Sequence, residues 1–215
     1  MARRFCLGLS GQKRSGKDLV ADIIAPMLRD EIAEQFDRVA LADPIKNMIT
    51  VFHYLDANSK IRRVNRDFIE QFKNISDYKP DSWNTNVRDA MIAIGEGLRA
   101  ICPNVWIDLA LRRDSRSKII TDIRHENEIN IIKETSSSII VRILRRETNV
   151  KDGELPETAL LKFDKLIPAE YEGPIEMANV PFDYVLRNDE EIDDLRGKIK
   201  NDLLPFILSK WKYFT

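Results

Sequence analysis

Short apolar runs alternate along the chain with segments whose apolar residues recur at helical spacing. The runs predict five buried strands, at residues 5–9, 39–42, 119–122, 139–144 and 184–186. Apolar residues at positions 20, 23, 24 and 28 predict a helix over 18–28, and further helices are expected over 126–134 and 190–210. Strands that alternate with helices imply a parallel sheet covered on both faces, which is an α/β sandwich of three layers.

Two segments depart from this alternation. Residues 44–112 have a polar, helical pattern that is broken near 58–59 and 79–82, so we expect a helical insertion within a single domain. Residues 146–181 carry many charges and the prolines Pro156, Pro168, Pro174 and Pro181. This composition is typical of a lid or a long loop.

Composition narrows the class of protein. The 215 residues suffice for a full core, and 43% apolar with 32% charged residues is ordinary for a globular chain. Because 34 basic residues nearly cancel 35 acidic ones, no global positive field would attract nucleic acid or a membrane surface. Cys6 and Cys102 are too few for a disulfide framework. Neither a spanning apolar segment nor a signal-peptide pattern is present, and we expect a cytoplasmic location.

The sharpest motif is Gly-Gln-Lys-Arg-Ser-Gly-Lys-Asp, which follows the first predicted strand. It matches the P-loop pattern G-x-x-x-x-G-K, with aspartate where Ser or Thr is usual. Glycines let successive backbone N–H groups face the β-phosphate of a nucleotide, and the next helix adds its positive end. The lysine then reaches the β- and γ-phosphates. We predict a nucleotide site at Gly11, Lys13, Arg14, Ser15, Gly16, Lys17 and Asp18.

The aspartate of this loop leaves two interpretations open. The Asp18 carboxylate could bind Mg²⁺ directly or through water, since this ion prefers oxygen ligands and retains several waters. It could instead only cap the start of the helix. Ser15 could supply a hydroxyl in its place. Asp122 ends the third predicted strand and is the second candidate for the metal, unless it caps the following helix.

The rest of the chain favours a kinase among the P-loop classes. No N-K-x-D string for reading guanine occurs, and Asp122 is followed by Ile123 rather than by the water-activating glutamate of ATPase motors. A small-molecule kinase must instead position a second phosphate and exclude water. Arginines that could clamp phosphate oxygens stand outside the loop, at Arg88, Arg99, Arg124, Arg142, Arg145 and Arg146.

The loop G-x-K-R-S-G-K-D resembles that of bacteriophage-type deoxynucleoside monophosphate kinases. Three further stretches resemble the same family: N-V-R at 86–88 with I-G-E-G-L-R at 94–99, P-N-V-W at 103–106, and T-D-I-R-H-E-N-E at 121–128. The resemblance covers most of the chain and weakens over 148–181. It implies an adenylate kinase-like fold with core strands ordered 2-3-1-4-5, and a homodimer is possible. The implied reaction moves the γ-phosphate of ATP, with Mg²⁺, onto a deoxynucleoside monophosphate.

Animal-type phosphomevalonate kinases are the alternative family. They share the loop type, a Gly-Glu with a downstream arginine, and an Asp-x-Arg after the third strand. The adenylate kinase-like fold is common to both families. They differ in acceptor, which is a nucleotide in one and a small phosphorylated acid in the other.

Chain position and resemblance together predict the acceptor site. Arg88 and Arg99 lie about three helical turns apart, so both can share one face, although Arg99 could equally serve packing. Trp106 could stack on a base or anchor the core, and Glu128 could bind a base or sugar or lie on a solvated helix face. The glycines near residue 95 indicate either close approach of a ligand or helix packing. The predicted set is Lys46, Arg88, Gly95, Glu96, Arg99, Trp106, Asp122, Arg124 and Glu128.

On the donor side, the resemblance implies that arginines after the fourth strand reach the nucleotide as the lid closes. Arg142 falls within the strand, so a structural role is open for it. Asn188 follows the fifth strand, where this fold often places the adenine. The predicted catalytic residues, which neutralise charge during in-line transfer, are Lys17, Arg124, Arg145 and Arg146.

A regulatory or nucleic-acid-binding P-loop protein, which binds nucleotide without transferring phosphate, is the competing class. The run from Arg112 to Lys118 contains four basic residues and could contact phosphates. One short basic run on a neutral chain more often marks a solvated turn. We therefore expect a small-molecule substrate, with neither nucleic acid nor a membrane as partner.

Overall fold

The structure is a computed structural model of the chain and describes residues 4–12, 14–111, 116–145 and 182–212. The chain divides into two compact units, one formed by Met1–Val39 with Asp114–Thr215 and the other by Ala40–Arg113. The predicted lid at 146–181 lies outside the described residues. Among the described helices, none is both long enough and apolar enough to cross a bilayer.

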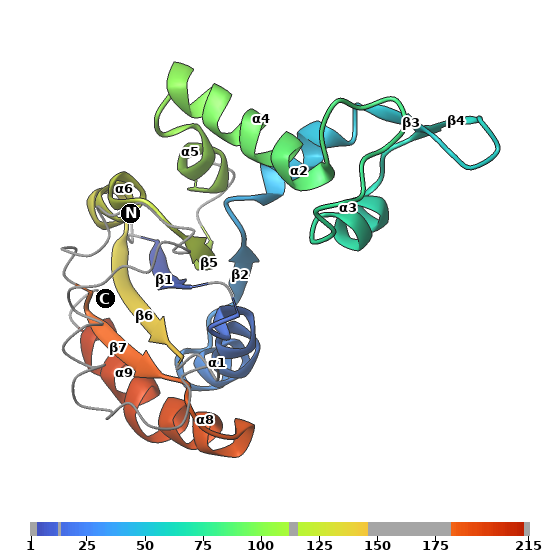
Figure 1. Cartoon of the computed structure of the whole chain (residues 1–215). Coiled ribbons are helices and arrows are strands. Elements are labelled where there is room, and N and C mark those ends of the chain that lie inside the picture. Colours follow the sequence, from blue (N-terminus) through green and yellow to red (C-terminus); the bar gives the residue numbers. More distant parts are fainter. Residues whose placement is uncertain (1–3, 13, 112–115, 146–181, 213–215) are drawn as a thin grey trace, which may run out of the picture. The chain divides into compact units, whose positions relative to one another are not determined.

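The first unit is built on a sheet of five parallel strands (Figure 1). The strands lie side by side in the order β2-β5-β1-β6-β7, which is 2-3-1-4-5 when the strands of this sheet alone are counted. Both the α/β class and the predicted strand order are thereby confirmed. The strands are β1 (Phe5–Gly11), β2 (Phe36–Val39), β5 (Ser117–Ile123), β6 (Ser137–Leu144) and β7 (Tyr184–Arg187).

One face of the sheet carries the main core. Alternate residues of β1, Phe5, Leu7 and Leu9, are buried against α1 (Lys17–Ile32), which contributes Ile24 and Leu28. The core continues into the carboxyl-terminal helices α8 (Ile192–Lys198) and α9 (Leu204–Trp211). The helix α6 (Glu126–Thr135) packs on β6, and its buried residues lie outside this core cluster. The continuous burial of β1 matches the apolar run that predicted this strand, and the burial of α1 at Val20, Ile24 and Leu28 matches the helical spacing that predicted the helix.

The predicted helix over 190–210 is divided by a π-helical turn, η2 (Ile199–Leu203), between α8 and α9. Pro205 is the second residue of α9 and has no N–H to donate to the preceding turn. A wider turn just before proline accommodates that missing bond. The buried side chains of Ile199 and Leu203 keep the segment in the core.

The second unit has its own small core. Its helices are α2 (Asp43–Ile49), α3 (Arg66–Phe72), α4 (Val87–Ile101) and α5 (Val105–Leu111), and its strands are β3 (His53–Leu55) and β4 (Ile61–Arg63). Phe68 stacks on Tyr54 with ring centroids 4.2 Å apart, and Phe72 stacks on Tyr78 at 3.9 Å. Asparagine side chains cap α3 and α4 at their first turns. Aromatic stacking and capping thus stabilise a unit of few residues.

Two expectations about elements were wrong. The second strand is β2, at Phe36–Val39, and the apolar run that follows forms a turn into α2, with the N–H of Asp43 bonded to the carbonyl of Ala40 at 3.0 Å. Pro44 fixes a helical φ at the start of α2, so the strand cannot continue. The hairpin β3–β4 was read as part of a helical segment, because its three-residue strands are too short for period-two alternation to be recognised.

The hairpin turn is organised by one carboxylate. Asp56 accepts backbone N–H bonds from Asn58 at 2.9 Å and Lys60 at 3.0 Å, and its other oxygen accepts from Arg62 Nε at 2.8 Å. Ser59 takes the left-handed conformation that the turn requires. The Arg62 hydrogen bond, followed by the backbone bonds, lowers the pKa of Asp56. The Asn58-Ser59 break in the sequence pattern is therefore a hairpin turn.

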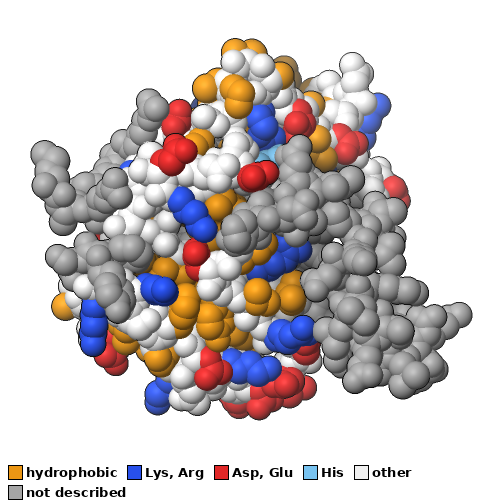
Figure 2. All heavy atoms as spheres, turned by 90° about the vertical axis from the view of Figure 1, so that its left-hand side faces the viewer, with side chains coloured by type: hydrophobic (Ala, Val, Ile, Leu, Met, Phe, Trp, Pro, Cys, Tyr) orange, Lys and Arg blue, Asp and Glu red, His pale blue; other side chains and the backbone are white. Residues whose placement is uncertain are grey.

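Charge is well mixed on the described surface. Figure 2 shows basic and acidic side chains interspersed among apolar ones on one face. The basic run that suggested nucleic acid binding does not form a patch among described residues. Lys118 is only 2% exposed and Arg116 pairs with Asp37 at 3.0 Å. Arg112 and Arg113 lie outside the described residues.

We expect opposite effects from adding a methyl group at two glycines. An alanine Cβ at Gly8 would lie 2.7 Å from Ile140 Cδ1 and closer still to Ile123, so Gly8→Ala should destabilise the protein by about 1–3 kcal/mol. Gly197 in α8 has open space around the same position, so Gly197→Ala should stabilise by about 0.5–1 kcal/mol. Urea unfolding of both variants measures the difference. Equal effects of the two changes would contradict this account of β1 packing.

Candidate active site

The P-loop joins the end of β1 to the start of α1. Arg14 and Gly16 both take left-handed conformations, with φ of 64° and 93°. The N–H of Ser15 bonds back to the carbonyl of Gln12 at 3.2 Å, which closes the turn. The N-cap residue of α1 is Gly16, which has no side chain to make a capping hydrogen bond. The N–H groups at this helix start are therefore available to an anion, as in phosphate-binding loops.

Both glycines of the motif are required by close approach. A Cβ at Gly11 would lie 2.5 Å from the carbonyl oxygen of Ile143 in β6. A Cβ at Gly16 would collide with the side-chain amide of Asn188, which follows β7. The loop is thus pressed against the carboxyl ends of two neighbouring strands, and any side chain at either position would displace it.

Asn188 holds the loop rather than standing free for adenine. Its Nδ2 donates to the carbonyl of Ser15 at 2.9 Å, and its backbone N–H donates to Leu144 at 2.8 Å. The side chain is only 5% exposed. The structure therefore gives Asn188 a role in supporting the P-loop, and its contact with adenine stays a prediction. Nothing in the sequence pattern links it to a loop more than 170 residues away.

The side chain of Lys17 folds back onto the backbone of the P-loop. Its ammonium donates to the carbonyls of Gly11 at 2.9 Å and Gln12 at 2.6 Å. Ser15 is 2% exposed, and its hydroxyl has no hydrogen-bond partner within the described part of the chain. A buried hydroxyl without a partner is uncommon in folded proteins and fits a ligand oxygen or water. The described part of the loop thus offers phosphates the Lys17 ammonium and the Ser15 hydroxyl.

The carboxylates proposed for Mg²⁺ are differently placed. Asp122 is the penultimate residue of β5, whose register sets Ile123 beside Ser10 of β1, so it lies at the same sheet edge as the loop. Asp18 is the second residue of α1, makes no capping hydrogen bond and forms an ion pair with Arg38 of β2. Among the described residues no cluster of three acidic, His or Cys side chains could hold a metal. One or two carboxylates that act with substrate phosphates nevertheless suit Mg²⁺.

Glu128 serves the start of α6. Its carboxylate accepts the backbone N–H groups of Arg124 at 2.8 Å and His125 at 3.0 Å, and it is 4% exposed. The structure therefore gives it a capping role and contradicts the alternative of a solvated helix face, while its contact with a base or sugar stays a prediction. The backbone turn that it fixes leaves the side chain of Arg124 exposed. Glutamate three residues into a helix signals such a cap, but histidine before it is an unusual partner.

The arginines around β6 separate into two kinds. The guanidinium of Arg142 lies 5.0 Å from the ring centroid of Phe182, which supports the structural role left open for it. Arg145 directly follows β6 and is exposed. Arg146, like Lys13 of the loop, lies outside the described residues. Arg145 is thus the described arginine of this segment that faces solvent.

In the second unit, Lys46 is engaged in an ion-pair cluster. Its ammonium lies 2.8 Å from Glu70 and 3.6 Å from Asp43, and its side chain is 16% exposed. Burial raises the pKa of Glu70, but the hydrogen bonds from Lys46 and Lys73 outweigh it, and the pKa is lowered overall. Lys46 is therefore a paired lysine within this unit. A role for Lys46 at the acceptor stays a prediction.

Gly95, the first residue of the Gly-Glu-Gly stretch, and Trp106 are part of helix packing. Trp106 is 2% exposed and its Nε1 donates to the carbonyl of Gly95 at 3.1 Å. A Cβ at Gly95 would lie 3.3 Å from Ile45 Cδ1, so the glycine lets α4 approach α2 closely. Arg99 pairs with Glu96 one turn earlier at 2.8 Å. The structure favours the packing alternatives for Gly95 and Trp106, because a buried ring has no face for a base.

Arg88 occupies a different position on the same helix. It is the second residue of α4, two residues after the Asn86 cap, and it is half-buried. A guanidinium in the first turn of a helix lies beside the unsatisfied N–H groups of that end. Cation and N–H donors together suit a phosphate monoester, which keeps Arg88 as the leading acceptor candidate of this unit.

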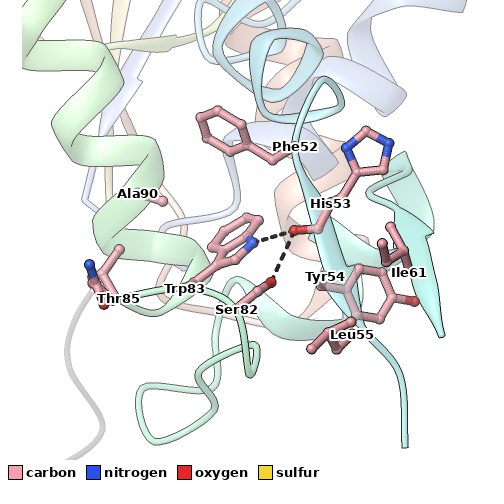
Figure 3. A pocket seen from close by; sticks show the side chains of 10 residues that line it. Phe52, His53, Tyr54, Leu55, Ile61, Ser82, Trp83, Thr85 and Ala90 are labelled. Carbon is pink, nitrogen blue, oxygen red and sulfur yellow. Dashed lines mark hydrogen bonds between the residues drawn. The ribbon is translucent and has the colours of Figure 1, made fainter. Parts of the chain in front are cut away.

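A cavity of about 550 Å³ lies in the second unit (Figure 3). Aromatic side chains form much of its wall, and Trp83 Nε1 is fixed by a 2.7 Å bond to the carbonyl of His53. Phe52 meets Trp83 edge-on, with centroids 5.6 Å apart. The volume lies in the range of small-molecule sites. None of the site residues predicted from sequence lines it, and no sequence motif marks it.

A family model for phosphomevalonate kinase matches residues 9–138, which is more than half of the chain. The chain belongs to the phosphomevalonate kinase family. The match includes the P-loop, the second unit and the segment from Asp122 to Glu128. The phosphomevalonate kinase family was the alternative in the sequence analysis. Its match and the strand order place the chain among P-loop kinases.

Several solved structures are similar over nearly the whole chain. They include Mycobacterium tuberculosis APS kinase in complex with AMPPNP and APS (13% identity, 95% of this chain and 99% of that one, TM-score 0.44). Dephospho-CoA kinase from Campylobacter jejuni has 12% identity, with 94% and 96% covered and a TM-score of 0.43. No curated protein sequence matches the chain. Likenesses this distant carry no argument, so the fold assignment depends on the topology itself.

Asn188→Ala tests the support of the P-loop. The change leaves the Ser15 carbonyl without its buried donor, so we expect a loss of about 1–3 kcal/mol in unfolding free energy and weaker ATP binding. Denaturant unfolding and calorimetric ATP titration measure both. Arg187→Ala, an exposed change one residue earlier, is the matched control. Unaltered ATP affinity in Asn188→Ala would remove the residue from the site.

Proposed function

We propose that this chain transfers the γ-phosphate of ATP to the phosphate of a small acceptor, and that the acceptor is a deoxynucleoside monophosphate. The observation that carries the reaction is the P-loop, whose curled backbone, uncapped helix start and Lys17 ammonium converge at the carboxyl end of the central strand. Those groups bind and neutralise phosphates without any covalent role for the protein.

The proposed mechanism is in-line attack of an acceptor phosphate oxygen on the γ-phosphorus. The acceptor oxygen is already ionised, so no strong general base is needed. Lys17 would exchange its bonds to the loop carbonyls for phosphate oxygens, and Arg124 and Arg145 are exposed cations at the same edge of the sheet. When bound, Mg²⁺ would supply further neutralisation of phosphate charge, and Asp122 and Ser15 are the residues that would hold it through its waters.

Two acceptors have support of different kinds. The deoxynucleotide is favoured by the loop G-x-K-R-S-G-K-D and the three later stretches, which run in order over most of the chain. Phosphomevalonate is favoured by the family model that matches residues 9–138. Both acceptors present a phosphate monoester to the γ-phosphate, so the same donor site serves either. The acceptor must therefore be decided by assay.

An ADP-release assay with MgATP compares the acceptors directly. We expect turnover with several deoxynucleoside monophosphates and less with the ribonucleotides. Turnover with phosphomevalonate alone would transfer the chain to the second candidate. Bound ATP without turnover on any acceptor would favour a regulatory P-loop protein.

Lys17→Ala tests the donor site. Loss of the ammonium removes charge stabilisation of the transferring phosphoryl group, so we expect kcat to fall about a hundredfold to a thousandfold. The unfolding midpoint should hardly change, because Lys17 is only partly buried and bonds to its own loop. An unchanged kcat would refute the assignment.

Arg88→Ala tests the acceptor site in the second unit. A lost charge-assisted bond to phosphate should raise the acceptor KM about tenfold to a hundredfold, with the ATP KM nearly constant. Arg62→Ala, which removes the guanidinium bonded to Asp56 in the hairpin, is the control in the same unit. Equal changes in both KM values would argue against a specific contact with the acceptor.

A further inference from the structure

The aspartate of the P-loop has a cationic partner that no motif revealed. Arg38, in β2, reaches the first turns of α1 and engages two carboxylates at once. One terminal nitrogen binds Asp18, and the other lies 2.5 Å from Asp22. The two aspartates are four residues apart on α1, so they lie on the same helix face one turn apart. Asp18 directly follows Lys17.

The carboxylate of Asp18 poses an electrostatic problem for ATP binding. P-loops usually carry a neutral hydroxyl at this position, whereas Asp18 brings a negative charge to the start of the helix that receives phosphates. Repulsion between unit charges about 6 Å apart changes an affinity about threefold even in water-like surroundings, and more where water is excluded. A triphosphate without metal therefore needs this carboxylate neutralised or turned away.

We propose that Arg38 is a positioning residue that holds the Asp18 carboxylate away from metal-free ATP and yields it to the waters of Mg²⁺ when MgATP binds. Asp22 is the second half of the device, because Arg38 can stay anchored to it while Asp18 turns. The proposal rests on the proposed ATP binding and deepens it. It gives Asp18 a metal-linked role with a defined resting position.

Exposure of the three side chains suits a reversible contact. The side chains of Asp18, Asp22 and Arg38 are 76%, 63% and 42% exposed. Ion pairs this exposed add little to stability, so breaking one costs little when a metal competes for the carboxylate. A purely structural salt bridge would act on folding alone and leave the effect of Mg²⁺ on ATP binding unchanged.

The test measures ATP affinity by calorimetry, once in EDTA and once with excess Mg²⁺, on the full chain without acceptor. In Arg38→Gln, metal-free ATP should bind about threefold to tenfold more weakly and MgATP within about twofold of the parent. In Asp18→Asn, metal-free ATP should bind more tightly and the gain from Mg²⁺ should shrink. Adding Arg38→Gln to Asp18→Asn should then have no further effect, since the charge that it restrains is gone.

Arg116→Gln is the matched control, because Arg116 forms an ion pair at 3.0 Å with Asp37, which precedes Arg38 in β2. It should leave the ratio of the two affinities unchanged. Three results would each overturn the proposal. Arg38→Gln could weaken metal-free ATP and MgATP equally, or it could still weaken metal-free ATP when Asp18→Asn is already present. Arg116→Gln could also weaken metal-free ATP selectively, as Arg38→Gln is expected to do. A folded parent protein that binds neither form of ATP would overturn the proposed function, and this inference with it.

Discussion

The tight approach of the P-loop to the carboxyl ends of β6 and β7 is the contact on which the rest of the site depends. Gly11 passes the carbonyl of Ile143 with no room for a Cβ, and Gly16 does the same at Asn188. These contacts fix where α1 begins and hence where its N–H groups and Lys17 are aimed. A phosphate site made of backbone donors needs such rigidity, since preorganised dipoles stabilise charge without rearranging during the reaction. The parallel sheet supplies it by bringing the ends of its strands to one edge.

The sequence predicts β1, the P-loop and α1 well, because the patterns that indicate them involve neighbouring residues. The apolar run before Gly11, the loop pattern and the period-four burial of α1 all describe neighbouring residues. Errors arise where local signals compete. The apolar residues Ala40 and Leu41 extend the pattern of β2, but Pro44 favours a helix start and the strand ends at Val39. The hairpin was missed because six residues of short strand give too few alternations.

The candidate site was predicted less completely, for a different physical reason. Arginine, glutamate, tryptophan and asparagine can each bind a ligand or satisfy the protein's own polar groups, and sequence alone does not reveal which partner lies nearby. Glu128 binds backbone N–H groups at the start of its own helix, and Asn188 binds the carbonyl of a loop that the sheet brings to it from far along the chain. Trp106 donates to the backbone of another helix. Buried polar groups need hydrogen-bond partners. Some polar residues of a sequence motif therefore bond to the protein's own backbone and not to a ligand.

The change from hydroxyl to aspartate at position 18 illustrates how a loop accommodates an added charge. A neutral hydroxyl at this position can lie beside phosphates without a counter-charge. A carboxylate at the same position requires a counter-charge whenever the metal is absent. Arg38 is placed to supply it from a strand that is not adjacent to the loop's own strand in the sheet order. The fork of a guanidinium suits the task better than an ammonium, since its two terminal nitrogens can bind separate carboxylates in a fixed geometry. The charge of Asp18 and the position of Arg38 are therefore best understood as one feature of the nucleotide site.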